Sequence, residues 1–175
     1  MLLGIDHIGL VTEEPAGLVP AMTALGMSKL DSGIAAAYRV ACEFWQPPGP
    51  GGRPLIELVS PAEPGSALDG HLARSGPGLH HIAIEVDHLE PELDRLRGAG
   101  FTPVDREPCA GARPGMLVAF TYLARPAGLL VELVQYRDSS SSEQRGGRHP
   151  ARRDHGLRRA ARSAGEGEHP GSDLA

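Results

Sequence analysis

The hydrophobic and polar positions of the first 136 residues predict the same succession of elements twice. A strand is predicted at about 4–12 and another at about 79–87, because apolar side chains recur there at alternate positions. A helical pattern follows each strand, and each helix ends near a glycine suited to a left-handed cap. The helical patterns span 15–27 and 90–101, and the later extended segments are 37–46, 54–60, 101–105, 116–123 and 129–135.

This pattern indicates an α+β fold made of two paired modules, at about residues 1–62 and 76–136, each of βαββ or βαβββ order. The Pro- and Gly-rich segment 46–54 is predicted to be a hairpin loop. It is not a phosphate-binding loop, because neither a Gly-Lys-Ser/Thr triplet nor a helix follows it.

The two halves also share polar residues at matched positions. "IDHIGLVTEEP" (5–15) can be aligned with "LHHIAIEVDHLEP" (79–91), which places His7 over His81 at an offset of 74. "LIELVSP" (55–61) can be aligned with "LVELVQY" (130–136), which places Glu57 over Glu132 at an offset of 75. A repeat of this kind indicates one structural unit used twice.

Strand parity predicts where these four side chains point. His81 shares a face with Ala83, and His7 shares a face with Gly9, so each histidine has a small residue beside it. His80 is predicted to face the opposite way, toward the helix layer, as a packing residue.

Glu57 and Glu132 lie in strands that are apolar on both faces, where an isolated carboxylate is costly unless it is paired. No Lys or Arg occurs on these strand segments. A divalent metal ion held by His7, Glu57, His81 and Glu132 would satisfy all four groups.

Charge divides the chain into two parts. Residues 1–136 carry 16 Asp and Glu against 9 Lys and Arg, whereas 137–175 carry 8 Arg against 6 acids, within a total formal charge of −5. The second part is rich in Arg, Ser and Gly and poor in large apolar residues, so we expect a disordered tail. Its basic cluster is interpreted as solvated, the alternative being contact with nucleic acid or a phosphorylated ligand: Arg152, Arg153, Arg158, Arg159 and Arg162. No nucleic-acid partner is predicted.

The N-terminal stretch lacks a basic region and is interrupted by Asp6 and His7, so it does not resemble a signal peptide. No apolar run approaches the roughly 18 residues of a membrane span. Cys42 and Cys109 are far apart and suggest neither a disulfide framework nor a zinc site. These features predict a cytoplasmic protein with no membrane partner.

The segments "IDHIGLV", "PLIELVSP", "GLHHIAIEVDHLEPELDRLRGAGF" and "GLLVELVQY" resemble the vicinal oxygen chelate (glyoxalase/bleomycin resistance/dioxygenase) superfamily, and within it the methylmalonyl-CoA epimerases. The resemblance covers about residues 1–136. It implies two βαβββ modules whose sheets curve around a divalent metal, with ligands at His7, Glu57, His81 and Glu132. Two nitrogen and two oxygen ligands suit Co²⁺, Ni²⁺, Zn²⁺, Mn²⁺ or Fe²⁺.

The resemblance further implies a metal-dependent epimerase (isomerase) that moves a proton at a carbon next to a carbonyl. Glu132 and Glu43 would be its two catalytic groups, the alternative for Glu43, which alternates with Cys42 and Phe44, being a surface position. Its small-molecule substrate would be an acyl-CoA, and the family suggests a homodimer. Two other interpretations stay open: another enzyme of the superfamily, such as a glyoxalase I-type lyase or an epimerase of a keto-sugar or specialised metabolite, and a metal-free binding protein. "FTYLARPAGLL" (120–130) stands where the epimerases have a His-Pro-Lys-Ser segment, so the acyl-CoA assignment is the least supported.

Overall fold

The computed structural model describes residues 1–137, so the expected tail lies, apart from Arg137, outside the described residues. The described part contains three α-helices, a short 3-10 helix and nine strands. In chain order these are β1 (Leu2–Val11), α1 (Pro15–Ala24), β2 (Ser28–Ala35), η1 (Ala36–Tyr38), β3 (Val40–Gln46), β4 (Leu55–Pro61), α2 (Asp69–Ser75), β5 (Gly78–Val86), α3 (Leu89–Gly98), β6 (Thr102–Pro103), β7 (Cys109–Ala110), β8 (Met116–Leu123) and β9 (Leu129–Tyr136). None of these helices is both long and apolar enough to span a membrane.

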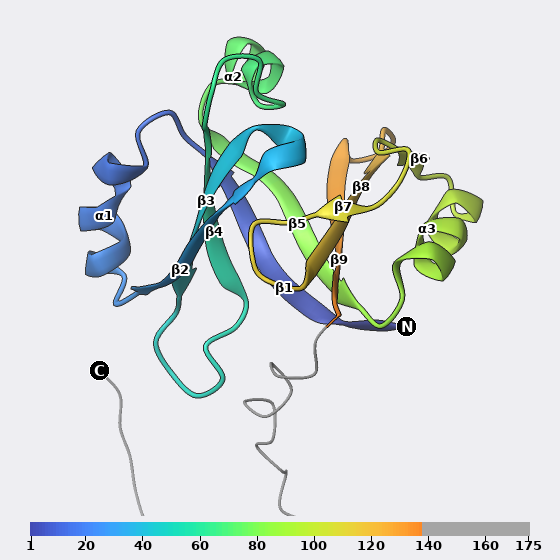
Figure 1. Cartoon of the computed structure of the whole chain (residues 1–175). Helices are drawn as coiled ribbons and strands as arrows, with labels where there is room; N and C mark the ends of the chain where they lie inside the picture. Colours follow the sequence, from blue (N-terminus) through green and yellow to red (C-terminus); the bar gives the residue numbers. More distant parts are fainter. Residues whose placement is uncertain (138–175) are drawn as a thin grey trace, which may run out of the picture. The chain divides into compact units, whose positions relative to one another are not determined.

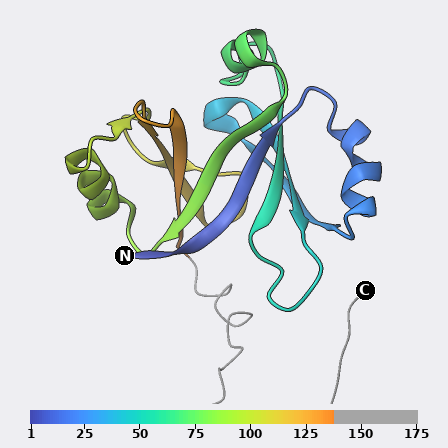
Figure 2. The ribbon, with the colours of Figure 1, turned by 180° about the vertical axis from the view of Figure 1, so that it is seen from behind.

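All nine strands belong to one mixed sheet, in the order β2-β3-β4-β1-β5-β9-β8-β6, with β7 paired to β8. The first strand of each half runs parallel to its last strand, β1 with β4 and β5 with β9, and the two halves meet where β1 pairs antiparallel with β5. Figure 2 shows β1 and β5 side by side in the middle of the sheet. The predicted α+β fold of two βαβββ modules is confirmed.

Some elements differ from the pattern-based prediction. β2 was not predicted, because it is an edge strand whose side chains are mostly exposed and show no apolar alternation. α2, between the modules, was not predicted either, since it has seven residues and none of them is buried. β7 was not predicted either; together with β6, which lies within the predicted segment 101–105, it takes the place in the second module of the continuous strand β2.

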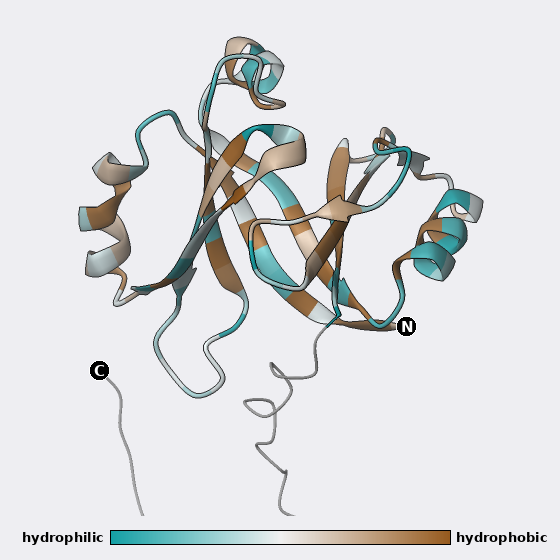
Figure 3. Cartoon of the chain, in the orientation of Figure 1, coloured by the Kyte–Doolittle hydropathy of each residue, from teal (hydrophilic) through white to brown (hydrophobic). Residues whose placement is uncertain are grey.

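Two helices cover the outer face of the sheet, one for each module. Met22 of α1 packs with Trp45 and Leu58, whereas Leu89 of α3 packs with Leu133. In Figure 1, α1 and α3 lie on opposite flanks, and Figure 3 shows hydrophobic residues concentrated on the strands and polar residues on much of α3. The inner face, which points away from α1 and α3, is not covered by these two helices.

The segment between β7 and β8 reaches from the second module to the first. Arg113 in this segment donates a hydrogen bond from Nε to Asp31 Oδ2 (3.3 Å), and its guanidinium lies 5.2 Å from the centre of the Phe44 ring. Gly33 of β2 lies directly against the carbonyl oxygen of Ala112, where a Cβ would overlap it. These contacts close the inner face on one side.

We expect Gly33→Ala to destabilise the protein by about 1–3 kcal/mol, because the new methyl must push the 111–115 segment away from β2. Urea unfolding of the two proteins measures the difference. Gly17→Ala, in α1, is the matched control: its Cβ would meet only ordinary contacts, and alanine should stabilise the helix by about 0.5–1 kcal/mol. Equal stabilities for Gly33→Ala and the native protein would contradict the close packing of this segment.

Candidate metal centre

Four neighbouring strands, β4, β1, β5 and β9, each place one polar side chain on the inner face. These are Glu57, His7, His81 and Glu132, and their four ligand atoms lie within 4.8 Å of one another. His7 Nε2 lies 3.0 Å from Glu132 Oε2 and 3.2 Å from Glu57 Oε2, and His81 Nε2 lies 3.0 and 3.3 Å from the same two oxygens. All four side chains are buried, so the donor atoms converge on one point inside the protein.

Two small residues between these strands make the convergence possible. Gly9 on β1 pairs with Glu57 on one side and with His81 on the other. Ala83 on β5 pairs in the same way with His7 and Glu132. A side chain at position 9 would overlap the His81 ring, so the absence of one there gives that ring its space.

A β-bulge in each central strand places a second polar group behind each histidine. Ile5 of β1 pairs with Ile84 of β5, and His7 pairs with the adjacent Ala83. Asp6 therefore has no partner residue on β5 and is the extra residue of the bulge. Asp6 Oδ2 accepts a hydrogen bond from His7 Nδ1 at 2.9 Å. On β5 the extra residue is His80, and its Nδ1 lies 3.0 Å from His81 Nδ1.

Asp6 is fully buried and held by several partners. Arg53 forms an ion pair with it, and the Tyr136 hydroxyl donates to its Oδ2 at 3.2 Å. Burial alone would raise the pKa of Asp6, but His7 and Arg53 outweigh burial and lower the pKa to about 2. The group behind His7 is therefore a carboxylate at neutral pH.

The charges of the quartet fit a divalent cation. Burial alone would lower the pKa values of His7 and His81, but Glu57 and Glu132 raise both pKa values above the usual range. The two carboxyl pKa values are held below their usual range by the histidines, against the effect of burial. Two carboxylates whose charges need a cation, together with two imidazole nitrogens, form a donor set suited to transition-metal ions and zinc.

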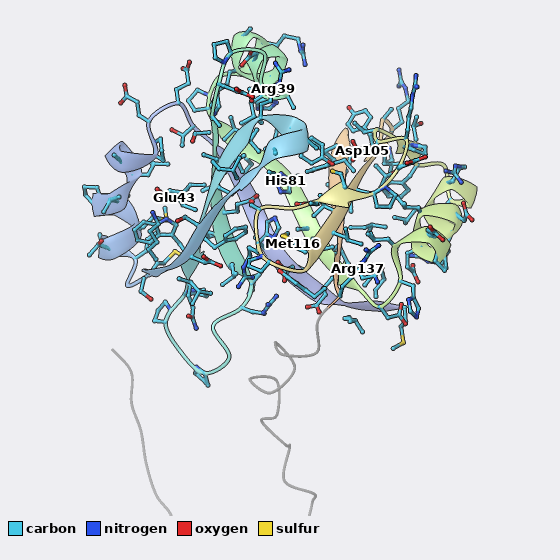
Figure 4. All side chains as sticks on the ribbon, viewed as in Figure 1. Arg39, Glu43, His81, Asp105, Met116 and Arg137 are labelled. Atoms are coloured by element: carbon cyan, nitrogen blue, oxygen red, sulfur yellow. The ribbon has the colours of Figure 1, made fainter. Side chains whose placement is uncertain are left out.

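The structure does not bring Glu43 to this quartet. Glu43 alternates on β3 with Cys42 and Phe44, which face inward, and its Oε1 lies 2.8 Å from Lys29 Nζ. It pairs in register with Leu58, which packs in the α1 layer. Figure 4 shows Glu43 on the α1 side of the molecule, away from His81.

His80 also differs from the sequence-based prediction. It does not pack against the helices behind the sheet; its ring contacts the ring of His71 on α2, with centroids 4.7 Å apart, and it lines the inner cavity. His80 departs from strict strand alternation because the bulge resets the alternation at this residue. Burial and the neighbouring His81 lower the pKa of His80 to about 4.

Sequence reasoning missed the residues behind His7. The sequence shows that Asp6 directly precedes the candidate ligand His7. Strict strand alternation, however, would place Asp6 on the face of the sheet opposite to His7. Arg53 and Tyr136 carry no such signal, because they reach Asp6 from the 47–54 loop and from the end of β9.

A cavity of about 170 Å³ opens beside the quartet. Apart from Glu57, His81 and Glu132 of the quartet and the neighbouring His80, its wall is almost entirely apolar. The wall comprises Ala35, Tyr38, Val40, Cys42, Glu57, Val59, Ala67, Leu68, His80, His81, Val104, Gly111, Ala112, Met116, Val118, Phe120, Leu130 and Glu132. Neither Lys nor Arg occurs among these lining residues. The cavity suits a small organic group whose polar atoms face the quartet.

The chain belongs to the Glyoxalase/Bleomycin resistance protein/Dioxygenase superfamily, since the model of this family matches residues 6–120. Within that superfamily, its similarities include methylmalonyl-CoA epimerases. It is 39% identical over 82 residues to the ethylmalonyl-CoA/methylmalonyl-CoA epimerase of Cereibacter sphaeroides, a match that covers 46% of this chain and 60% of that protein.

Two further similarities cover more of the chain. The uncharacterized protein YqjC of Bacillus subtilis is 30% identical over 119 residues, which are 68% of this chain and 81% of that protein. The solved structure of a Streptomyces coelicolor methylmalonyl-CoA epimerase variant, in complex with 2-nitronate-propionyl-CoA, matches with a TM-score of 0.69 at 26% identity. That match covers 79% of this chain and 100% of the epimerase.

We expect Gly9→Ala to weaken divalent-metal binding by at least tenfold although it removes no ligand, because the methyl would displace the His81 ring. Calorimetric titration of the metal-free protein with Zn²⁺ or Co²⁺ measures this effect. Gly17→Ala on α1 serves as the control and should bind like the native protein. Unchanged affinity in Gly9→Ala would show that His81 is not needed in its present position.

Metal affinity should fall as the pH is lowered through the neutral range. His7 and His81 must be neutral to bind a cation, and Glu57 and Glu132 raise their pKa values, so without metal they retain protons at higher pH than free histidine. Metal binding should then release protons from the two histidines. For each proton released, the metal affinity should fall by up to tenfold per pH unit below the raised pKa. Titrations at several pH values, in buffers of different ionisation enthalpy, count these protons; an affinity independent of pH would contradict the assignment.

Proposed function

We propose that this protein is a divalent-metal-dependent enzyme that moves a proton at a carbon next to a carbonyl, with methylmalonyl-CoA epimerisation as the first candidate reaction. The observation that carries this proposal is the buried His7, Glu57, His81 and Glu132 quartet beside an apolar cavity. Two carboxylates at the end of an apolar cavity favour a catalytic role over a purely structural one. In a purely structural core, apolar residues in their place would give a similar or higher stability.

In this proposal the four residues of the quartet would hold the ion. When bound, the ion supplies Lewis-acid stabilisation for negative charge that develops on substrate oxygens. Glu132 carries the proton: its carboxylate lines the cavity, and a carboxylate that takes a proton from carbon and returns it acts as a general base and then as a general acid. Asp6 and the surrounding strands hold the imidazoles in place.

The cavity wall supports a substrate with a compact apolar group next to two oxygen atoms. The oxygens would face the quartet, and residues such as Val40, Val118 and Phe120 would surround the aliphatic part. A volume of about 170 Å³ accommodates such a group but not a whole coenzyme, so the rest of an acyl-CoA would extend outside. The Streptomyces coelicolor epimerase, which is in complex with a propionyl-CoA derivative, supports this class of substrate.

One observation favours a second candidate function. Epimerisation needs a proton carrier on each side of the carbon, and Glu43, expected to be one of them, lies outside the cavity. Among the described residues that line the cavity, the carboxylates are Glu57 and Glu132 alone. A reaction in which one carboxylate moves a proton between neighbouring carbons, as in a glyoxalase I-type enzyme, requires no further base.

Solvent deuterium uptake, followed by NMR, tests the proposal and separates the two candidates. We expect the metal-loaded protein to exchange the α-proton of methylmalonyl-CoA and to interconvert its two epimers. Exchange with retention of configuration, or conversion of an α-ketoaldehyde hemithioacetal instead, would favour the one-carboxylate reaction. A chain that binds less than about half an equivalent of divalent ion would be a binding protein, contrary to the proposal.

Glu132→Gln should lower the rate of this exchange by about 10²-fold or more, because the amide cannot accept the proton. The variant should keep the native circular dichroism spectrum, since glutamine has almost the same shape. Glu43→Gln is the matched control, and we expect its exchange rate to stay within about threefold of the native rate. Native exchange in Glu132→Gln would rule out the proposed role of this residue.

A further inference from the structure

We propose that Asp6 and His80 are positioning residues that fix the two histidines of the quartet unequally, so that Asp6 makes His7 the stronger metal ligand and His80 makes His81 the weaker one. This inference rests on the proposed metal site. It adds two residues to that site and predicts which of the two histidines dominates the affinity.

The two residues occupy equivalent places in the duplicated fold. Each immediately precedes a histidine of the quartet, and each is the extra residue of a bulge in the β1–β5 pairing. Because of the bulge, the side chain lies behind the neighbouring imidazole instead of on the opposite face. Asp6 Oδ2 is 2.9 Å from His7 Nδ1, and His80 Nδ1 is 3.0 Å from His81 Nδ1.

These contacts leave the Nε2 atoms free for the quartet. His7 Nε2 and His81 Nε2 both point at the carboxylate oxygens of Glu57 and Glu132. An imidazole that binds a cation through Nε2 carries its proton on Nδ1, so it donates to whatever lies behind it. A partner that accepts this hydrogen bond fixes both the tautomer and the orientation of the ring.

The two partners differ in charge. Asp6 is fully buried, ion-paired with Arg53 and hydrogen-bonded by Tyr136, which keep it an anionic acceptor in a fixed position. Arg113 in turn donates to the Tyr136 hydroxyl at 3.1 Å. A hydrogen bond to a carboxylate is stronger than one to a neutral acceptor and makes the imidazole a better electron donor.

His80 can offer only a neutral acceptor to His81. Its Nδ1 accepts a hydrogen bond from the Nδ1–H of His81, and its own proton then resides on Nε2. Its ring is only partly buried and rests edge-on against His71 of α2. His81 is therefore oriented by a weaker and more exposed contact than His7.

Asp6→Asn tests the charge of this contact, because the amide oxygen still accepts a hydrogen bond. We expect the dissociation constant for Co²⁺ or Zn²⁺, measured by competition with a chromophoric chelator, to rise by about 10–100-fold. His80→Ala should raise it by less than about fivefold, and His80→Asn, which keeps an acceptor, should stay closer to the native value. Asp94→Asn, on the exposed side of α3, is the control and should change nothing.

The visible absorption bands of the Co²⁺-loaded protein provide the second measurement, because they report the donor strength of the ligands and not the stability of the fold. They should shift in Asp6→Asn more than in His80→Ala, while the apo variant keeps a cooperative thermal transition. Unchanged bands and a dissociation constant within twofold of native in Asp6→Asn would overturn the inference and leave the proposed function intact. Failure of the native protein to bind any divalent ion would overturn both.

Discussion

The structure depends on the need to balance two buried carboxylates. Glu57 and Glu132 lie in strands that are apolar on both faces, and their oxygens point at the same two imidazole nitrogens. Bringing two like charges into an apolar interior costs several kcal/mol for each ion unless a cation or a proton compensates them. The two carboxylates raise the pKa values of His7 and His81, so a proton or a divalent cation at the quartet would compensate their charge.

The duplicated fold brings the four donor side chains to one place. Two copies of one module meet at β1 and β5, so the first and last strands of both modules become four neighbours. Each strand then contributes one donor, and Gly9 and Ala83 keep the space between them open. The helices cover the outer face and the 111–115 segment closes the inner face on one side, so the cavity beside the donors remains apolar. The same duplication places Asp6 and His80 behind the two histidines.

The two modules and the quartet could be predicted from the sequence, because the internal repeat supports them at several positions and not at a single residue. The matched offsets placed His7, Glu57, His81 and Glu132 at equivalent points of two modules, and the structure brings all four together. The failures have local causes. Strand parity cannot reveal a bulge, which is why His80 was assigned to the wrong side and Asp6 was overlooked. The position of Glu43 was open because the sequence did not define the register of β3, and the edge strand β2 lacks the apolar alternation that identifies a strand.

Two features of the described residues bear on the substrate and not on the quartet. The cavity wall carries neither Lys nor Arg among its described residues, and Glu43 does not reach it. If the quartet holds a divalent ion, anomalous scattering from crystals grown with Mn²⁺ or Co²⁺ will locate it. We expect one strong peak per chain, bounded by His7 Nε2, His81 Nε2 and the carboxylates of Glu57 and Glu132. A quartet without a peak in crystals that hold the ion elsewhere would contradict this expectation.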